Sequence, residues 1–215
     1  MSENYKTEYI MDELACPKCG HKHILKKYGT VNVTEKKKMK EKILKNELFV
    51  FRCEKCGLHA PLTYDSLYVD HKRKLMIYLA PVMTGEVQEK LDALGSIKGG
   101  TKRVVDNIND LKEKIMIADN HLDDRVIELL KIMVINQIKA EMKDDNLVDI
   151  LFDYSPGNLW FVLFFEKKGM GRIPLSLENY RQIERQYRMG ILDFSRDDFM
   201  KVDLEWAGRI MFRPN

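Results

Sequence analysis

The sequence has no long hydrophobic run, and it is poor in proline, glycine and cysteine. Its 215 residues include 6 Pro, 12 Gly and 4 Cys. The longest uncharged apolar run spans 159–165, far fewer than the roughly 20 residues that a membrane-spanning helix needs. The first residues also lack the apolar core of a signal peptide. We therefore expect a protein that neither spans nor binds a membrane and that is located in the cytoplasm.

The composition is that of a globular protein with a core. Hydrophobic residues make up 45% and charged residues 32% of the chain, and the length suits one or two domains. The net charge of +3 is too small to require a nucleic-acid partner. Residues 1–81 nevertheless carry 16 Lys and Arg against 10 Asp and Glu, whereas residues 82–215 carry 20 against 23. The basic charge thus belongs to the N-terminal part.

All four cysteines fall into two C-x-x-C-G motifs, Cys16/Cys19 and Cys53/Cys56. Such a motif makes a tight turn that directs two sulfurs at one point, and the glycine accepts the positive φ of the turn. Two turns supply four thiolates in a tetrahedron, which suits zinc. Because protein ligands fill all four positions, we expect a structural zinc site rather than a catalytic one.

Two alternatives to zinc remain open. Iron also accepts four thiolates, as in a rubredoxin-like site, and C-x-x-C pairs can act as thiol redox centres. The motifs are separated by residues 20–52, a longer gap than the usual 15–20 of a compact four-cysteine site. A helix expected at 35–46, with Thr34 as its N-cap, accounts for the excess.

The apolar patterns predict an α+β fold. We expect an antiparallel zinc ribbon with an inserted helix at 1–81, a connector with one short helix at 82–100, and a small α+β region at 101–215. In that region, 121–142 reads as a long helix whose wide apolar surface is covered on two sides. It is therefore either central to the fold or part of a subunit interface. Alternating apolar residues predict strands at 147–154 and 159–166, joined by a turn at 155–158.

Several stretches resemble one known family, the bacterial CpXC proteins, which carry two C-P-x-C-type motifs with a helical insert between them. They are C-P-K-C-G at 16–20, E-K-I-L at 41–44, E-L-F-V-F-R-C at 47–53, L-Y-V-D-H at 67–71 and K-L-M-I-Y-L at 74–79. The stretches 111–115 and 122–131 are similar to the family's continuation, so the resemblance covers at least 14–131. Glu54 stands where the family often has proline, a position that does not bind metal. The resemblance implies a metal site but no activity, because the family is functionally uncharacterised.

Other polar clusters have ordinary structural explanations. His21, His23 and His59 flank the motifs and read as loop histidines, with a role as ligand or as hydrogen-bond donor to sulfur as the alternative. The acidic group Asp119, Asp123, Asp124 and Glu128 suits a helix start capped by Asn120 better than an acid/base site. Asp149 and Asp153 fit the polar face of a strand.

No catalytic constellation is visible, so we expect a protein without enzymatic activity. The first hypothesis is an interaction scaffold that contacts a protein partner, or a second copy, through helix 121–142. The second is a nucleic-acid-associated regulator that uses Lys36, Lys37 and Lys38, although the interleaved glutamates favour a solvated helix face. The third is an iron electron-transfer or thiol redox protein.

Overall fold

The structure is a computed structural model that describes residues 5–142, 144–155, 158–192 and 198–212. Within these residues it has ten strands and seven helices, so the predicted α+β class is confirmed. The chain divides into two compact units, Met1–Lys112 with Asp197–Met200, and Glu113–Arg196 with Lys201–Asn215. Among the described helices, none combines the length and the apolar character needed to cross a bilayer.

A five-stranded sheet forms the centre of the first unit, in the order β1-β2-β5-β6-β7. Its strands are β1 (Glu8–Ala15), β2 (Lys22–Asn32), β5 (Ser66–Asp70), β6 (Leu75–Leu79) and β7 (Thr101–Val105). β1 and β2 are antiparallel, as are β5 and β6, whereas β2 with β5 and β6 with β7 are parallel pairs. β5 and β6 are buried along their whole length because they lie at the middle of the sheet.

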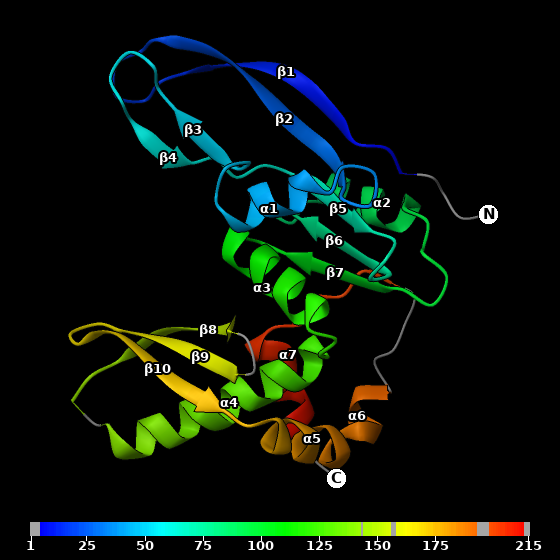
Figure 1. The fold of residues 1–215 in the computed structure, drawn as a ribbon, viewed down its shortest axis with the longest axis vertical. Coiled ribbons are helices and arrows are strands. Elements are labelled where there is room, and N and C mark those ends of the chain that lie inside the picture. The colour runs from blue at the N-terminus through cyan, green and yellow to red at the C-terminus, as the bar shows by residue number, and fades with distance from the viewer. Residues whose placement is uncertain (1–4, 143, 156–157, 193–197, 213–215) are drawn as a thin grey trace. The chain divides into compact units, whose positions relative to one another are not determined.

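Most of β1 and β2 extends beyond the rest of this sheet as a hairpin. β2 pairs with β5 only through Thr30–Asn32, whereas it pairs with β1 along its length. Figure 1 shows this long hairpin, with the short antiparallel pair β3 (Val50–Arg52) and β4 (His59–Pro61) near its far end. The far end therefore depends on contacts other than the main core.

Three helices accompany the sheet: α1 (Lys38–Leu44), α2 (Gly85–Ala93) and α3 (Ile108–Asp119). α1 buries Met39 and Ile43. α2 packs Val87 and Leu91 against a cluster of sheet side chains made of Leu67, Val69, Met76, Tyr78, Ala80 and Val104. α3 begins in the first unit and ends in the second.

The second unit packs helices with a three-stranded antiparallel sheet. The sheet has the order β10-β9-β8, with β8 (Leu147–Ser155), β9 (Asn158–Phe165) and β10 (Gly169–Leu175). Its helices are α4 (Asp124–Glu141), α5 (Leu177–Gln186), α6 (Arg188–Leu192) and α7 (Leu204–Met211). α4 contacts α5, α7 and β8, and Phe152, Phe161 and Trp206 are fully buried. The predicted turn at 155–158 includes residues 156 and 157, which lie outside the described residues.

Two predicted helix starts are wrong, because each side chain has a different partner. Thr34 does not cap α1, which begins at Lys38 without a side-chain cap. The Thr34 hydroxyl instead accepts a hydrogen bond from the backbone N–H of His71. α4 begins at Asp124, and its N-cap is Asp123 rather than Asn120. A tertiary contact thus occupies the Thr34 hydroxyl, and the better-placed carboxylate of Asp123 caps α4.

The grouping of segments also differs from the sequence-based division at 81 and 100. α2 packs on the five-stranded sheet, and β7 pairs with β6 along Thr101–Val105. The segment 82–105 thus contributes to the first unit. A parallel β6–β7 pair requires a crossover connection, and α2 lies in that connection.

Candidate metal centre

Each cysteine pair sits in a loop at the end of its own hairpin. The first loop joins β1 to β2, and the second joins β3 to β4. β1 was not predicted, because its apolar residues at 9–11 are consecutive rather than alternating. β2 pairs with β1 and β5, whereas β3 pairs with β4 in a separate two-stranded sheet.

The two loops share one backbone conformation. In each loop the N–H of the first cysteine donates to the carbonyl five residues later, and the glycine N–H donates to the carbonyl of the first cysteine. These bonds are Cys16 to His21 (2.8 Å), Gly20 to Cys16 (2.9 Å), Cys53 to Leu58 (2.8 Å) and Gly57 to Cys53 (2.9 Å). Both glycines have φ 70°, a left-handed conformation that glycine adopts without strain. The repeated motif therefore makes the same turn twice.

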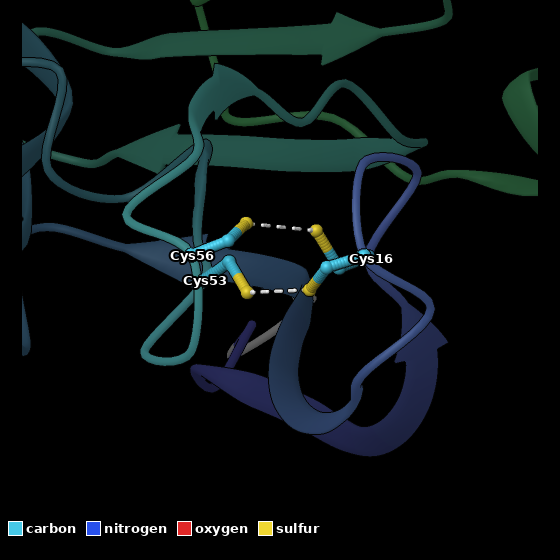
Figure 2. A group of neighbouring side chains, drawn as sticks. Cys16, Cys53 and Cys56 are labelled. Carbon is cyan, nitrogen blue, oxygen red and sulfur yellow. Dashed lines mark hydrogen bonds between the residues drawn. The ribbon is translucent and has the colours of Figure 1, made fainter.

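The four sulfurs converge between these loops. Sγ of Cys16 lies 3.7 Å from Sγ of Cys56, and Sγ of Cys19 lies 3.6 Å from Sγ of Cys53. All four lie within 4.8 Å of one another. Figure 2 shows the Cys16 side chain facing those of Cys53 and Cys56 across the gap. The spacing is far longer than a disulfide bond of about 2.05 Å.

This spacing matches a tetrahedral metal site. With metal–sulfur distances of about 2.3 Å, the sulfurs of a tetrahedral zinc site lie roughly 3.8 Å apart. Cys16 and Cys53 are buried, and Leu14, Leu25, Phe51, Leu58 and Leu62 pack around the cluster. Four cysteines this close together can hold a metal ion, and the donor set fits zinc and iron alike.

The electrostatics of the cluster also favour a cation. Burial opposes the ionisation of Cys53, but the backbone N–H of Cys56 and the ring of His23 outweigh it and lower the pKa of Cys53 to about 5. At Cys19 the backbone N–H of His21 favours the thiolate. Burial and the three neighbouring sulfurs outweigh that bond and raise the pKa of Cys19 to about 12. Four thiolates therefore coexist here only with a compensating positive charge.

Of the three histidines near the motifs, His23 contacts a cysteine sulfur through its ring. Nε2 of His23 lies 3.3 Å from Sγ of Cys53, and its ring packs edge-on against Phe51 at 5.2 Å. His21 packs against His23, and His59 lies exposed on β4. His23 thus has the position of a hydrogen-bond donor to sulfur. This is the alternative role that the sequence left open beside a loop histidine.

The predicted acidic group does not form one site. Asp123 caps α4 and pairs with Arg125 at 2.7 Å. Asp124 and Glu128 are instead buried among lysines. On β8, Asp153 pairs with Arg172 of β10, as suits a polar strand face.

A buried ionic network links α3 with α4 in the second unit. Glu128 Oε1 accepts hydrogen bonds from Lys114 at 2.9 Å and from Lys131 at 3.2 Å. Lys131 also binds Glu113 at 2.7 Å, and Lys114 lies 3.3 Å from Asp124. Glu113 accepts the backbone N–H of Phe152 on β8, and Lys114 donates to the carbonyl of Val202 at 2.7 Å. These buried charged residues therefore have a structural role, because each is paired with an opposite charge within the network.

The protonation of this network follows from burial and pairing. Burial raises the pKa of Glu113 despite the nearby ammonium of Lys131. Burial acts to lower the pKa values of Lys114 and Lys131, but the carboxylate of Glu128 outweighs it and raises both. The sequence did not predict this network, because the packing of α3 against α4 produces no recognisable pattern among neighbouring residues.

Comparison with known proteins places this arrangement in one family. The family model described as CpXC protein matches residues 14–131, which include both cysteine loops, the five-stranded sheet's inner strands and the ionic network's helical residues. No curated protein and no solved structure matches the chain. The match covers more than half of the 215 residues. The chain therefore belongs to the CpXC protein family.

Proposed function

We propose that this protein is a non-enzymatic interaction protein whose protruding hairpins are held together by a structural zinc ion. Cys16, Cys19, Cys53 and Cys56 are the proposed ligands. The observation that carries the proposal is the convergence of their sulfurs within 4.8 Å, at the junction of two hairpins far from the main core. Four protein ligands leave no open position for water or substrate, which is the mark of a structural site.

The exposed surface of the β1–β2 hairpin supports an interaction role. Tyr9 and Met11 on β1 are 46% and 57% exposed, and Ile24 on β2 is 69% exposed. These three share one face of the hairpin, whereas Ile10 faces the other side, because successive strand residues alternate. A group of large apolar side chains on the surface is typical of a contact with another protein. A metal ion at the tip would hold this hairpin in one conformation and so reduce the entropy lost on binding.

The second candidate surface, helix 121–142, is smaller than its sequence suggests. Val126, Ile127, Leu129 and Leu130 of α4 are buried within the second unit, and Met133 is 43% exposed. The apolar width of this helix is explained mainly by its central place in the fold. Self-association through it stays a prediction.

Zinc is preferred over iron because the proposed role needs folding energy and no redox change. Zinc has no redox chemistry, and binding at such a site contributes directly to folding. The proposal places the protein in the cytoplasm, where a reducing environment keeps the four thiols free to bind metal.

The test is the metal content and visible absorption of protein purified without added metal. We expect one zinc per chain, no visible colour, and loss of the zinc in a Cys53→Ser, Cys56→Ser variant. A control variant, His59→Ala, should retain the zinc. A red, iron-containing protein would replace the proposal with electron transfer, and robust turnover on a substrate panel would refute the non-enzymatic role.

A further inference from the structure

Lysines from three separate segments gather at one end of the five-stranded sheet. β1 begins at this end, β2 and β5 finish there, and β6 begins there, as their pairing shows. Figure 1 shows this end on the side of the N-terminus, opposite the cysteine loops along the β1–β2 hairpin. The segments 5–7, 33–38 and 71–74 meet here and carry six exposed lysines, which we name the lysine rim: Lys6, Lys36, Lys37, Lys38, Lys72 and Lys74.

Hydrogen bonds hold these segments side by side. The backbone N–H of His71 donates to the hydroxyl of Thr34 at 2.8 Å, and Lys40 pairs with the buried carboxylate of Asp70 at 2.8 Å. The side chain of Asn32 donates to the carbonyl of Tyr5. The lysine rim is therefore one surface built from fixed backbone, although its members lie up to 68 positions apart in the sequence.

The rim has little acidic compensation. Within these three segments the acidic residue is Glu35, whose carboxylate accepts the backbone N–H of Thr7 at 3.1 Å; Glu8 follows at the start of β1. Glu41 of α1 also interacts electrostatically with Lys38, so six ammonium groups face three exposed carboxylates. A surface with this excess of positive charge is complementary to a polyanion.

We propose that the lysine rim binds the phosphate backbone of double-stranded DNA without sequence preference. Three strand spacings give the rim a width of about 14 Å, and a duplex of that length carries about eight phosphate charges. Lysine supplies point charges that suit backbone contacts rather than base recognition. The proposal rests on the proposed function in one respect, since it treats the chain as a binding protein and names its partner.

The side chains around the rim favour a duplex over other polyanions. Single strands are bound by stacking on exposed aromatic rings, whereas the aromatic side chains of these segments, Tyr5 and His71, are half-buried. Membrane surfaces are bound by basic faces with apolar anchors. The large exposed hydrophobic side chains of the described residues lie outside the three segments.

The test is fluorescence anisotropy with a labelled 20-base-pair DNA duplex and the zinc-loaded full chain. We expect the logarithm of the binding constant to fall with the logarithm of the salt concentration with a slope of about −5, which is about −0.9 for each of the six rim lysines. Two variants probe different segments: Lys36→Glu with Lys37→Glu, and Lys72→Glu with Lys74→Glu. Each should weaken binding at least about tenfold at low salt and reduce the slope by about 2. The matched control, Lys139→Glu with Lys168→Glu, changes the net charge equally at exposed positions of the second unit and should weaken binding less than about threefold.

Each other outcome refutes the proposal. Absent or salt-independent binding would do so, as would an effect confined to Lys36 and Lys37, because the rim would then not act as one surface. A different partner would be assigned by tighter binding to single-stranded DNA, to duplex RNA or to polyglutamate. The same holds for tighter binding to phosphatidylcholine vesicles that contain about 30% phosphatidylserine. Zinc content and turnover are measured on the same sample. A zinc-loaded protein that does not bind DNA therefore refutes this inference without refuting the proposed function.

Discussion

Nε2 of His23 lies 3.3 Å from Sγ of Cys53. The histidine comes from β2 and the cysteine from the second loop, so this contact ties the two hairpins together beside the proposed metal ligands. Hydrogen bonds to ligating sulfurs orient them and moderate their charge.

We expect His23→Phe to lower metal affinity by about 10- to 100-fold, the usual effect of removing such a partner. Phenylalanine supplies an aromatic ring that can pack edge-on against Phe51, as His23 does, and lacks the ring nitrogens. The measurement is competition with a chromophoric chelator. His59→Phe, at an exposed position of β4, is the control. Equal affinities for the two variants would mean that the His23 contact does not support the metal.

Removing the metal should loosen the hairpins and spare the second unit. The cluster around Cys16, Phe51 and Cys53 is small, and structural zinc sites contribute about 10–16 kcal/mol of binding energy to folding. After chelation, amides of β1, β3 and β4 should exchange at least about 100-fold faster, a loss of about 3 kcal/mol in local stability. Amides of β9 should keep their rates. Hydrogen-exchange mass spectrometry reports both, and unchanged rates in β3 and β4 would contradict a structural metal.

Glu128→Gln should destabilise the second unit by about 3 kcal/mol, because two buried lysines, Lys114 and Lys131, then lose their shared carboxylate. Glu141→Gln, at the exposed end of the same helix, should change the free energy of unfolding by less than about 0.5 kcal/mol. Urea unfolding measures both. A loss smaller than about 1 kcal/mol in Glu128→Gln would show that the network contributes little to stability.

Asp70 should contribute stability that disappears in acid. Its burial opposes ionisation, but the ammonium of Lys40 and the backbone N–H groups of Arg73 and Lys72 outweigh burial and lower its pKa below 3.8. A carboxyl whose pKa is lower in the folded state stabilises the fold above its unfolded pKa, and this contribution is lost as the pH falls through the folded value.

The corresponding variant is Asp70→Asn. At pH 7 it should cost about 2 kcal/mol, the scale of lost charged hydrogen bonds, and the difference from wild type should shrink as the pH falls from 4 toward 3. Urea unfolding across this range is the measurement, with Asp92→Asn on the exposed face of α2 as the control. A difference that stays constant with pH would show that the charge of Asp70 is not responsible.

The sequence by itself predicted the cysteine cluster, because the C-x-x-C-G motif determines its own turn through local hydrogen bonds and a glycine at positive φ. It also predicted the long apolar helix and the strands at 147–154 and 159–166, since their residues follow regular local patterns. The family resemblance over 14–131 is likewise a property of sequence and is confirmed.

Only the tertiary structure decided which segments meet. The partner of β2 is β1, whose apolar residues do not alternate, and Thr34 contacts His71 instead of capping a helix. The lysine rim and the ionic network join residues from distant segments, such as Lys37 with Lys72 and Glu113 with Lys131. Such contacts depend on strand order and helix packing, and these are set by burial across the whole chain rather than by the residues adjacent in sequence.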